Sequence, residues 1–522
     1  MNSRLENPSF ILMTLILGVI FSVLTFSMSA ATEEPVLGDG PFNLTIFHTN
    51  DAHSYFLPRP AVWRDDGRMV GGVIPLAWHL QQQRAHSSPD LLLDAGDFMT
   101  GNPVCQFAPN GVPGEAVARM MNLLQYDCGT IGNHEFDIGS ENLRRLVELF
   151  EFPLIAADIV DETARPVFRR EPLVVEKGGL KIGIMGVSCA EMSGVVAPSR
   201  FGNLKSIDQA WVLSRQAALL EAKVDLLVAI THNGFDGDVQ LAQVLAGTGV
   251  DIIVGGHSHS RLKKPHLEEG ILIVQAGSKW TNLGRLDLQV EDGRVVSYNG
   301  QLIDLWADGA EAGPELTKLV EGYEKQVAEE FGRTIGTLET AWRKGRGESN
   351  LGNFLADQMR LAAKADVGLV NSGGIRKSMN PGSITALDIN EMLPFSNMLV
   401  TARLTGKQLA TVVQANADAQ VGGKHGILQV SGLSYRFAAG AHEGVAAVQE
   451  ILVGGKPLVA ENVYTVAMPD YVVMMAHVYL NIDAPQTKDV GLTMTEAVVA
   501  GIAGAGPINS KIEGRIMRLD QK

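Results

Sequence analysis

The chain has 522 residues, which is too long for one ordinary hydrophobic core, so we expect two domains. Hydrophobic residues make up 46% and charged residues 19%, a composition typical of a globular protein rather than a disordered one. The 43 basic and 58 acidic residues give a net charge of −15, which argues against a protein that binds a nucleic acid polymer. An acidic protein can still bind a small anion where metal ions and a few arginines reverse the local field.

Residues 1–31 read as a secretory signal peptide. Arg4 lies in a short polar lead, residues 10–26 are almost wholly apolar, and Ser29-Ala30-Ala31 supplies small residues at a cleavage position. The apolar run is somewhat long for a signal, so an uncleaved N-terminal anchor is the alternative. Either interpretation predicts an exported protein, periplasmic or extracellular. After residue 40 no uncharged apolar stretch approaches the length of a membrane span.

The three cysteines are Cys105, Cys128 and Cys189. An odd number in an exported protein leaves at least one thiol unpaired, and their spacing matches no zinc motif. We expect buried structural cysteines, with one disulfide left open as an alternative.

Short apolar runs alternate with helical patterns over residues 42–305, which predicts a layered α/β domain. The expected strands are residues 44–47, 91–94, 154–157, 180–185, 226–230, 251–254 and 271–274, followed by a hairpin of residues 286–290 and 295–298. The expected helices are residues 114–124, 140–150, 207–222 and 239–245.

A charged stretch over residues 313–331 opens on proline and carries only a thin apolar stripe, so we expect a linker helix between two domains. The second domain, residues 332–522, has mixed patterns that predict an α+β fold. Its expected elements are helices at 351–365 and 406–417, strands at 367–370, 399–404, 448–453 and 463–468, and β-structure over 426–437.

Potential metal ligands follow five apolar runs of the first domain, each just past the end of a predicted buried strand. Side chains at the carboxyl ends of such strands meet at one rim of an α/β domain. These residues are Asp51, His53, Asp97, Asn133, His232, His257 and His259.

Together these side chains provide hard ligands for two divalent cations. Asp97 is the expected bridge, because a carboxylate has two oxygens and this one lies between strands, and Asn133 would ligate through its side-chain oxygen. Aspartate, asparagine and imidazole suit manganese, zinc or iron. Read alone, Gly96-Asp97 is an ordinary turn and His232 a hydrogen-bonded loop histidine; five such stretches in this order are hard to assign to chance.

The order Asp-x-His, Gly-Asp, Gly-Asn-His-Glu, His, Gly-His-x-His resembles the calcineurin-like metallophosphoesterases. Asn371-Ser-Gly-Gly-Ile-Arg376 and Leu393-Pro-Phe395 resemble the 5'-nucleotidase family, and the resemblance spans residues 42 to about 470. It implies an N-terminal metallophosphoesterase sandwich followed by a C-terminal 5'-nucleotidase domain. It also implies the distribution of ligands over two metal ions: Asp51, His53, Asp97 and His259 on one, Asp97, Asn133, His232 and His257 on the other.

By the same resemblance, His134 is the catalytic histidine, near the phosphoryl group but not on a metal, and Asp137 orients its ring. The implied mechanism is in-line attack of a metal-activated water on phosphorus. His134 would stabilise the transition state or protonate the leaving oxygen. The alternative for His134 is a purely structural role.

In the second domain the resemblance implies that Arg376 pairs with phosphate, Asn371 hydrogen-bonds the nucleoside and Phe395 stacks on the base. Arg346 corresponds to a further substrate arginine, with Arg343 as its competitor. An ordinary core phenylalanine is the alternative for Phe395. The glycine-aspartate run that relatives carry near the C-terminus is absent, and Tyr471 stands as the candidate second stacking ring.

We therefore predict an exported, two-metal phosphohydrolase that acts on 5'-nucleotides, with UDP-sugars and cyclic nucleotides as further candidate substrates. One alternative is a thiosulfohydrolase of the sulfur-oxidation type on the same fold. The other is a non-catalytic binding protein, although such proteins usually lose ligands and none is missing here.

Overall fold

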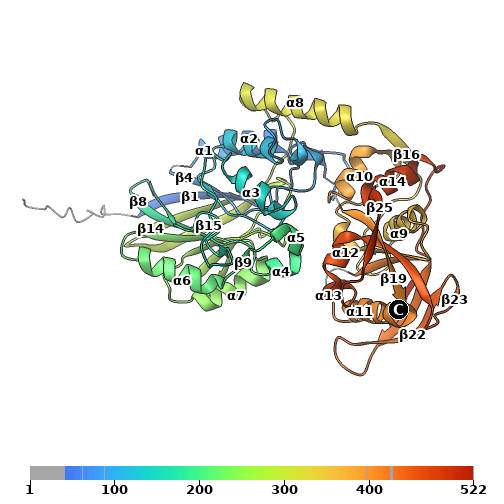
Figure 1. Cartoon of the computed structure of the whole chain (residues 1–522). Coiled ribbons are helices and arrows are strands. Elements are labelled where there is room, and N and C mark those ends of the chain that lie inside the picture. Colours follow the sequence, from blue (N-terminus) through green and yellow to red (C-terminus); the bar gives the residue numbers. More distant parts are fainter. Residues whose placement is uncertain (1–40, 62, 88, 396, 424–426, 521–522) are drawn as a thin grey trace, which may run out of the picture. The chain divides into compact units, whose positions relative to one another are not determined.

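A computed structural model describes residues 41–61, 63–87, 89–395, 397–423 and 427–520 (Figure 1). The predicted signal peptide and the start of the predicted β-structure at Gly426 lie outside the described residues. Within the described ranges, no helix is both long enough and apolar enough to cross a membrane. Cys105, Cys128 and Cys189 are all buried and free, so the disulfide left open by the sequence is not formed.

Two sheets form the centre of the first half of the chain, because each contains strands that are apolar on both faces. The first sheet consists, in spatial order, of β15 (Arg294–Asp304), β14 (Asn282–Glu291), β1 (Phe42–Thr49), β4 (Asp90–Asp94) and β5 (Cys128–Gly129). The second sheet consists of β12 (His266–Glu268), β13 (Ile271–Val274), β11 (Ile252–Val254), β10 (Leu226–Ile230), β8 (Leu180–Gly186) and β7 (Leu173–Lys177).

The two sheets pack against each other through one apolar core. Leu44 and Leu91 of the first sheet belong to the same buried cluster as Ile182, Leu227 and Ile253 of the second. Helices α6 (Gln209–Leu220) and α7 (Phe235–Leu245) contribute to this cluster too, so they cover the second sheet. The result is a layered α/β sandwich.

A second buried cluster covers the other face of the first sheet, and its longer helices number four among the described residues. They are α1 (Val73–Arg84), α2 (Glu115–Leu124), α3 (Ser140–Val147) and α8 (Pro314–Phe331). The last is the charged helix expected from the composition; its role as a domain linker stays a prediction. Its buried side chains are confined to one stripe, Leu316, Val320, Tyr323 and Val327.

The five ligand-bearing strands are divided between the two sheets: β1, β4 and β5 belong to the first, β10 and β11 to the second. Three expectations about the first domain need correction. Residues 154–157 form no regular strand, because Leu154 and Ile155 make only single bridges, to Gly129 and Arg169. Helix α3 ends at Val147 rather than at residue 150, and α7 begins four residues earlier than expected.

The second half of the chain is mixed α and β, as expected. Its larger sheet consists of β20 (Leu428–Ser431), β17 (Val367–Asn371), β24 (Val463–Pro469), β19 (Met398–Thr405) and β25 (Thr487–Thr493). A smaller sheet consists of β23 (Lys456–Pro457), β22 (Ala446–Val453), β21 (Leu433–Ala439) and β26 (Ile516–Arg518). The main helices are α9 (Asn350–Ala362), α10 (Ala386–Met392), α11 (Gly406–Val421) and α14 (Met494–Ala503). The sequence did not predict α10 and α14.

Candidate metal centre

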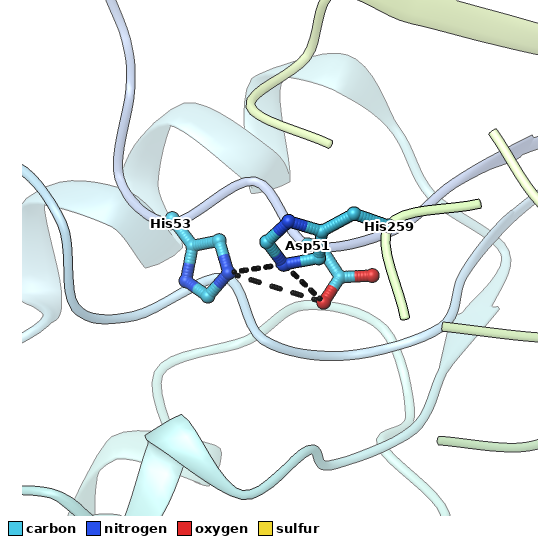
Figure 2. Close-up of side chains that lie close together, drawn as sticks. All are labelled: Asp51, His53 and His259. Atoms are coloured by element: carbon cyan, nitrogen blue, oxygen red, sulfur yellow. Dashed lines mark hydrogen bonds and ion pairs between the residues drawn. The ribbon is translucent and has the colours of Figure 1, made fainter. Parts of the chain in front are cut away.

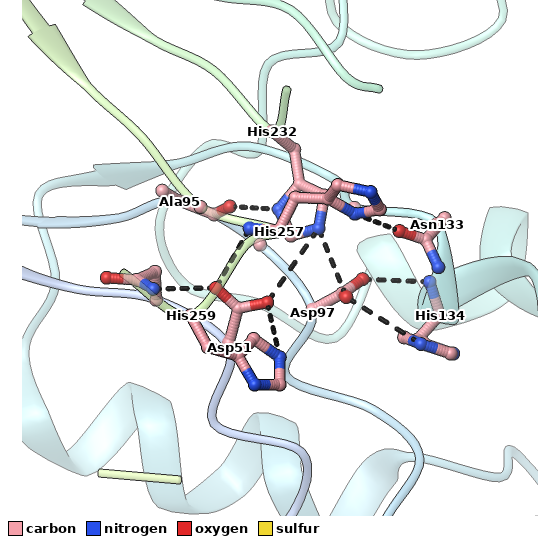
Figure 3. Close-up of polar contacts among 12 residues, drawn as sticks. Asp51, Ala95, Asp97, Asn133, His134, His232, His257 and His259 are labelled. Atoms are coloured by element: carbon pink, nitrogen blue, oxygen red, sulfur yellow. Dashed lines mark hydrogen bonds and ion pairs between the residues drawn. The ribbon is translucent and has the colours of Figure 1, made fainter. Parts of the chain in front are cut away.

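The carboxyl ends of five strands bring the predicted ligands to one rim (Figure 3). Strands β1, β4 and β5 run parallel to one another, and so do β10 and β11, so their carboxyl ends share an edge within each sheet. The ligands lie in the loops that follow these ends: Asp51 and His53 after β1, Asp97 after β4, Asn133 after β5, His232 after β10, and His257 and His259 after β11.

Asp51, His53 and His259 form one group of side chains (Figure 2). The Nε2 atoms of the two histidines are 2.9 Å apart, and Asp51 Oδ1 lies 3.3 Å from His259 Nε2 and 3.9 Å from His53 Nε2. The His53 Nδ1–H donates to the Thr100 carbonyl at 2.9 Å, which leaves Nε2 as the unprotonated nitrogen. Burial and the neighbouring His259 lower the pKa of His53 well below its ordinary value, so this imidazole is neutral, as a metal ligand must be.

Asp97, His232 and His257 form a second group, and Asn133 adjoins it. Asp97 Oδ2 lies 3.1 Å from His232 Nε2, and Asn133 Oδ1 lies 2.9 Å from His257 Nδ1. The His232 Nδ1–H donates to the Ala95 carbonyl at 2.6 Å, which directs Nε2 toward Asp97. Burial opposes a charge on His232, but Asp97 and Asp51 raise its pKa to about 10. The two carboxylates therefore favour positive charge next to the His232 ring, and a metal cation could supply that charge.

Two buried atoms test whether these residues fit metal ions. Asp51 Oδ1 and His232 Nε2 are buried and make no well-directed hydrogen bond among the described residues; their neighbours, His259 Nε2 at 3.3 Å and Asp97 Oδ2 at 3.1 Å, are themselves candidate ligands. Leaving a buried polar atom unsatisfied costs about 1–3 kcal/mol, more for a charged one, and a divalent cation would satisfy both. Asp97 also groups with His53 and His134, so it lies between the two ligand sets, where a bridging carboxylate belongs. The residues fit a pair of divalent ions.

The backbone at this rim is strained. Five of the seven proposed ligands have positive φ: Asp51 (52°), His53 (48°), Asp97 (57°), His257 (75°) and His259 (55°). For a residue with a Cβ atom this conformation is unfavourable, and such strain clusters at functional sites. Neighbouring glycines allow the close packing: a Cβ at Gly132 would overlap Asp97 Oδ1, and one at Gly256 would lie 2.7 Å from His232 Nδ1.

Glu135 holds the loop that carries Asp97, a role that the sequence analysis missed. Its carboxylate accepts the backbone N–H of Gly132 at 2.6 Å, of Asp97 at 2.9 Å and of Met99 at 3.0 Å. It thereby ties the loop after β4 to the loop after β5. The signal was present, because an acidic residue within the Gly-Asn-His-Glu stretch follows directly on two site residues.

His134 and Asp137 form a hydrogen-bonded pair beside the second ligand group. The Nδ1 atom of His134 lies 2.7 Å from Asp137 Oδ2, and its Nε2 lies 3.9 Å from Asp97 Oδ2. The His134 backbone N–H donates to Asp97 Oδ1 at 2.8 Å. Burial opposes a charge on the ring, but the carboxylates of Asp137 and Asp97 raise the pKa of His134 above its ordinary value. The ring is therefore fixed by its Nδ1, with Nε2 facing the ligand cluster.

A cavity of about 360 Å³ opens beside this cluster, a size that suits a nucleotide-sized ligand. Asn371, Arg376, Phe395 and Tyr471 all line it, together with His134. The Phe395 ring lies 5.6 Å from the His134 ring, centroid to centroid, at an interplanar angle of 30°. Four of the five predicted substrate residues are thus brought together with the predicted catalytic histidine.

Arg346 is the exception. Its side chain is exposed in the loop before α9, and it does not line the cavity. Gln429 of β20 anchors this loop by donating to the Gly347 carbonyl at 2.8 Å. The competitor Arg343 is engaged elsewhere, since its guanidinium donates to the Met379 carbonyl at 2.9 Å and to Asn380 Oδ1 at 2.7 Å.

Tyr479 lines the cavity and was missed by the sequence analysis. Its ring centroid lies 6.0 Å from that of Tyr471, in an edge-on arrangement. The spacing of eight residues from Tyr471 corresponds to about two helical turns, a signal that the sequence contains.

Comparison with known protein families agrees with this geometry. Residues 44–261 match the model of the calcineurin-like phosphoesterases, and residues 331–480 match that of the 5'-nucleotidase C-terminal domain. The chain belongs to the 5'-nucleotidase family. It is a hydrolase that acts on phosphoester bonds, and its two-domain mixed α/β fold is that of 5'-nucleotidases.

Three similar proteins illustrate the match. The trifunctional nucleotide phosphoesterase YfkN of Bacillus subtilis is 27% identical over 92% of this chain, which spans only 35% of that protein's length. The structure of a 5'-nucleotidase precursor from Thermus thermophilus is 27% identical, with a TM-score of 0.81 over 92% of this chain and 100% of that one. The sulfate thiohydrolase SoxB of the same organism has a TM-score of 0.76 over 92% and 97% of the two chains, but its 18% identity indicates a shared fold alone.

Proposed function

We propose that this protein is an exported 5'-nucleotidase that uses two divalent ions, such as manganese or zinc, to remove phosphate from 5'-nucleotides. The observation that carries the proposal is Asp97, whose carboxylate lies between His232 on one side and the His53 and His134 side chains on the other, beside a cavity lined by Asn371 and Arg376. A single carboxylate shared by two ligand groups is what a two-metal hydrolase requires.

The two bound ions would activate the attacking water and offset the charge that develops on the phosphoryl group. Asp51, His53, Asp97 and His259 would hold one ion, and Asp97, Asn133, His232 and His257 the other. Backbone carbonyl acceptors fix two of the imidazole rings. The Thr100 carbonyl accepts from His53 Nδ1–H and the Ala95 carbonyl from His232 Nδ1–H. This fixes the nitrogen that is left to bind metal.

His134 would act on the leaving oxygen through Nε2. The Asp137 carboxylate fixes its Nδ1 and favours the protonated ring, so His134 can donate a hydrogen bond or a proton to the leaving group. The short contact between the His134 and Phe395 rings supports a substrate whose base and phosphate lie within one cavity.

Arg376 would bind the substrate phosphate through its guanidinium, Asn371 would hydrogen-bond the nucleoside, and the base would stack between the rings of Phe395 and Tyr471. Asn371 is buried at the end of β17 and lines the cavity. Arg346 has no part in this proposal, because it does not line the cavity.

Export is part of the proposal and is supported by the pattern of residues 1–31: a polar lead with Arg4, an apolar run and small residues at 29–31. Mass spectrometry of the mature N-terminus in a secreting host would test it. Cleavage near residue 31 is expected, whereas an intact Met1 in a membrane fraction would favour the anchor.

The deciding experiment is a hydrolysis panel with added manganese. It compares 5'-nucleoside monophosphates, UDP-glucose, cyclic nucleotides and p-nitrophenyl phosphate, and it includes thiosulfonate substrates. Release of phosphate from AMP with an Asp97→Asn variant inactive is the expected outcome. Turnover of sulfur substrates alone, or binding of nucleotides without hydrolysis by the metal-loaded protein, would overturn the proposal.

A further inference from the structure

Two basic side chains lie against one tyrosine close to the proposed metal centre. Arg59 stands at the start of the short strand β2 (Arg59–Pro60), and Lys279 lies in the loop between β13 and β14. The Arg59 guanidinium carbon is 4.9 Å from the Tyr55 ring centroid, and Lys279 Nζ is 4.4 Å from it. Both cations are therefore held by the π-system of the same ring.

The backbone fixes this pair next to the ligand loop. The Lys279 N–H donates to the Asp51 carbonyl at 2.6 Å, and Tyr55 follows His53 by two residues. Lys279 and Trp280 both have positive φ, 59° and 47°, so this loop is held in a strained conformation. The Trp280 side chain that anchors it is fully buried.

Neither cation has an anionic partner of its own. Among the described residues, no carboxylate lies within 4.0 Å of the charged group of Arg59 or Lys279, and no hydrogen bond from either side chain is formed. The nearby carboxylate of Glu391 is engaged, because it accepts from Lys377 at 2.7 Å and from Asn102 at 2.9 Å. The Tyr55 hydroxyl is buried and also lacks a hydrogen-bond partner.

Both side chains are partly exposed, and two like charges held against one ring without a carboxylate partner repel each other, so such an arrangement favours an anion. Burial, together with the positive charges of Arg59 and Arg376, lowers the pKa of Lys279 well below its ordinary value. Arg376 also lines the substrate cavity, so the positive region around Tyr55 adjoins the place where the substrate phosphate is expected. An anion bound by Arg59 and Lys279 would offset both positive charges.

We propose that Arg59 and Lys279, both held against the Tyr55 ring, form a second anion site, which binds a phosphate group other than the one undergoing hydrolysis. This inference rests on the proposed phosphohydrolase function. The phosphate has two sources: the second phosphoryl group of a diphosphate substrate, or free inorganic phosphate released by the reaction.

The test compares the metal-loaded wild type with Arg59→Gln, Lys279→Gln and Lys279→Arg. Arg215→Gln is the matched control, because Arg215 lies 5.5 Å from the Trp211 ring centroid, on the surface helix α6. Two quantities are measured: the ratio of kcat/KM for a nucleoside diphosphate to that for the monophosphate, and the inhibition constant of inorganic phosphate against p-nitrophenyl phosphate.

If the substrate supplies the anion, both glutamine variants lower the diphosphate-to-monophosphate ratio at least tenfold. If the product supplies it, they raise the phosphate inhibition constant at least tenfold instead. In either case Lys279→Arg, which keeps the positive charge, leaves the measured quantity close to its wild-type value. Arg215→Gln does not change it. If neither quantity changes by more than twofold in the glutamine variants, the second anion site is overturned. The proposed hydrolase activity is not affected by that result.

A binding measurement separates the two failures. Should the wild type hydrolyse no phosphoester, the proposed function fails, yet calorimetric titration of the manganese-loaded protein with pyrophosphate still tests the site. The expected result is binding at least tenfold weaker in Lys279→Gln than in the wild type and the control. Equal affinity in all three proteins would overturn the inference.

Discussion

Replacing Asp137 by asparagine tests the role of the His134–Asp137 pair. The change keeps an acceptor for His134 Nδ1 at the 2.7 Å contact but removes the negative charge. A hydrogen bond to a charged group contributes about 1.5–3 kcal/mol and a neutral one about 0.5–1.5, so the substitution removes about 1–1.5 kcal/mol. Each 1.4 kcal/mol corresponds to about a tenfold change in rate, so we expect kcat to fall roughly 5- to 10-fold. Asp137→Ala, which also frees the ring, should lower kcat about 10- to 100-fold.

The assay is a double-mutant cycle on steady-state hydrolysis, with His134→Ala as the second change. If Asp137 acts only through the ring that it holds, Asp137→Asn lowers kcat by less than about twofold in the His134→Ala background. Glu141→Gln is the control, since Glu141 is an exposed acidic residue in the first turn of α3. An equal loss of kcat with and without His134 would refute the reasoning, provided that bound metal is unchanged.

Three further outcomes follow from the geometry. Gly132→Ala should lower bound metal and kcat at least tenfold, because the added Cβ would overlap Asp97 Oδ1. Metal analysis and steady-state kinetics check this. The control is Gly322→Ala, whose Cβ would meet nothing within 4 Å and which should leave bound metal and kcat unchanged. Burial raises the pKa of Asp238 to about 7, above the 3.8 of the unfolded chain, so its contribution to stability is complete below pH 4 and is lost as the pH rises through 7. Urea unfolding at pH 5 and 8 should therefore show a fall of about 2–4 kcal/mol that Asp238→Asn reduces, and an equal fall in both proteins would contradict the assignment. Chelation should abolish hydrolysis and lower Tm, and manganese at about 100 times its Kd should return about 2.7 kcal/mol; an unchanged Tm would argue against the ligand set.

The strands of the first domain could be predicted because buried parallel strands give continuous apolar runs. The apolar runs do not indicate which strands pair with each other in a sheet. Strand β1 pairs with β14, which lies more than 230 residues later, and no local pattern specifies that pairing. For the same reason the division of the ligand-bearing strands between two sheets could not be read from the sequence.

The candidate ligand residues could be predicted because each follows its strand directly and because their chemistry is distinctive. Arg59 and Lys279 carry no such signal: a basic residue in a loop is ordinarily solvated, and only the fold places both on Tyr55. The position of Arg346 outside the cavity could not be predicted for a related reason. Its position along the chain matched an expected motif, but the direction of its side chain depends on how the loop before α9 is anchored.

The positive φ angles at the rim imply a trade-off between thermal stability and activity in this enzyme. Left-handed backbone costs a residue with a Cβ roughly 1–2 kcal/mol, so five such positions together withhold on the order of 5 kcal/mol or more, comparable to the entire net stability of many domains. Glycine would relieve the conflict at any of them. Without metal, a His257→Gly protein should therefore have a higher Tm than the natural protein but no hydrolytic activity. A selection for heat resistance that did not measure turnover would enrich such inactive variants.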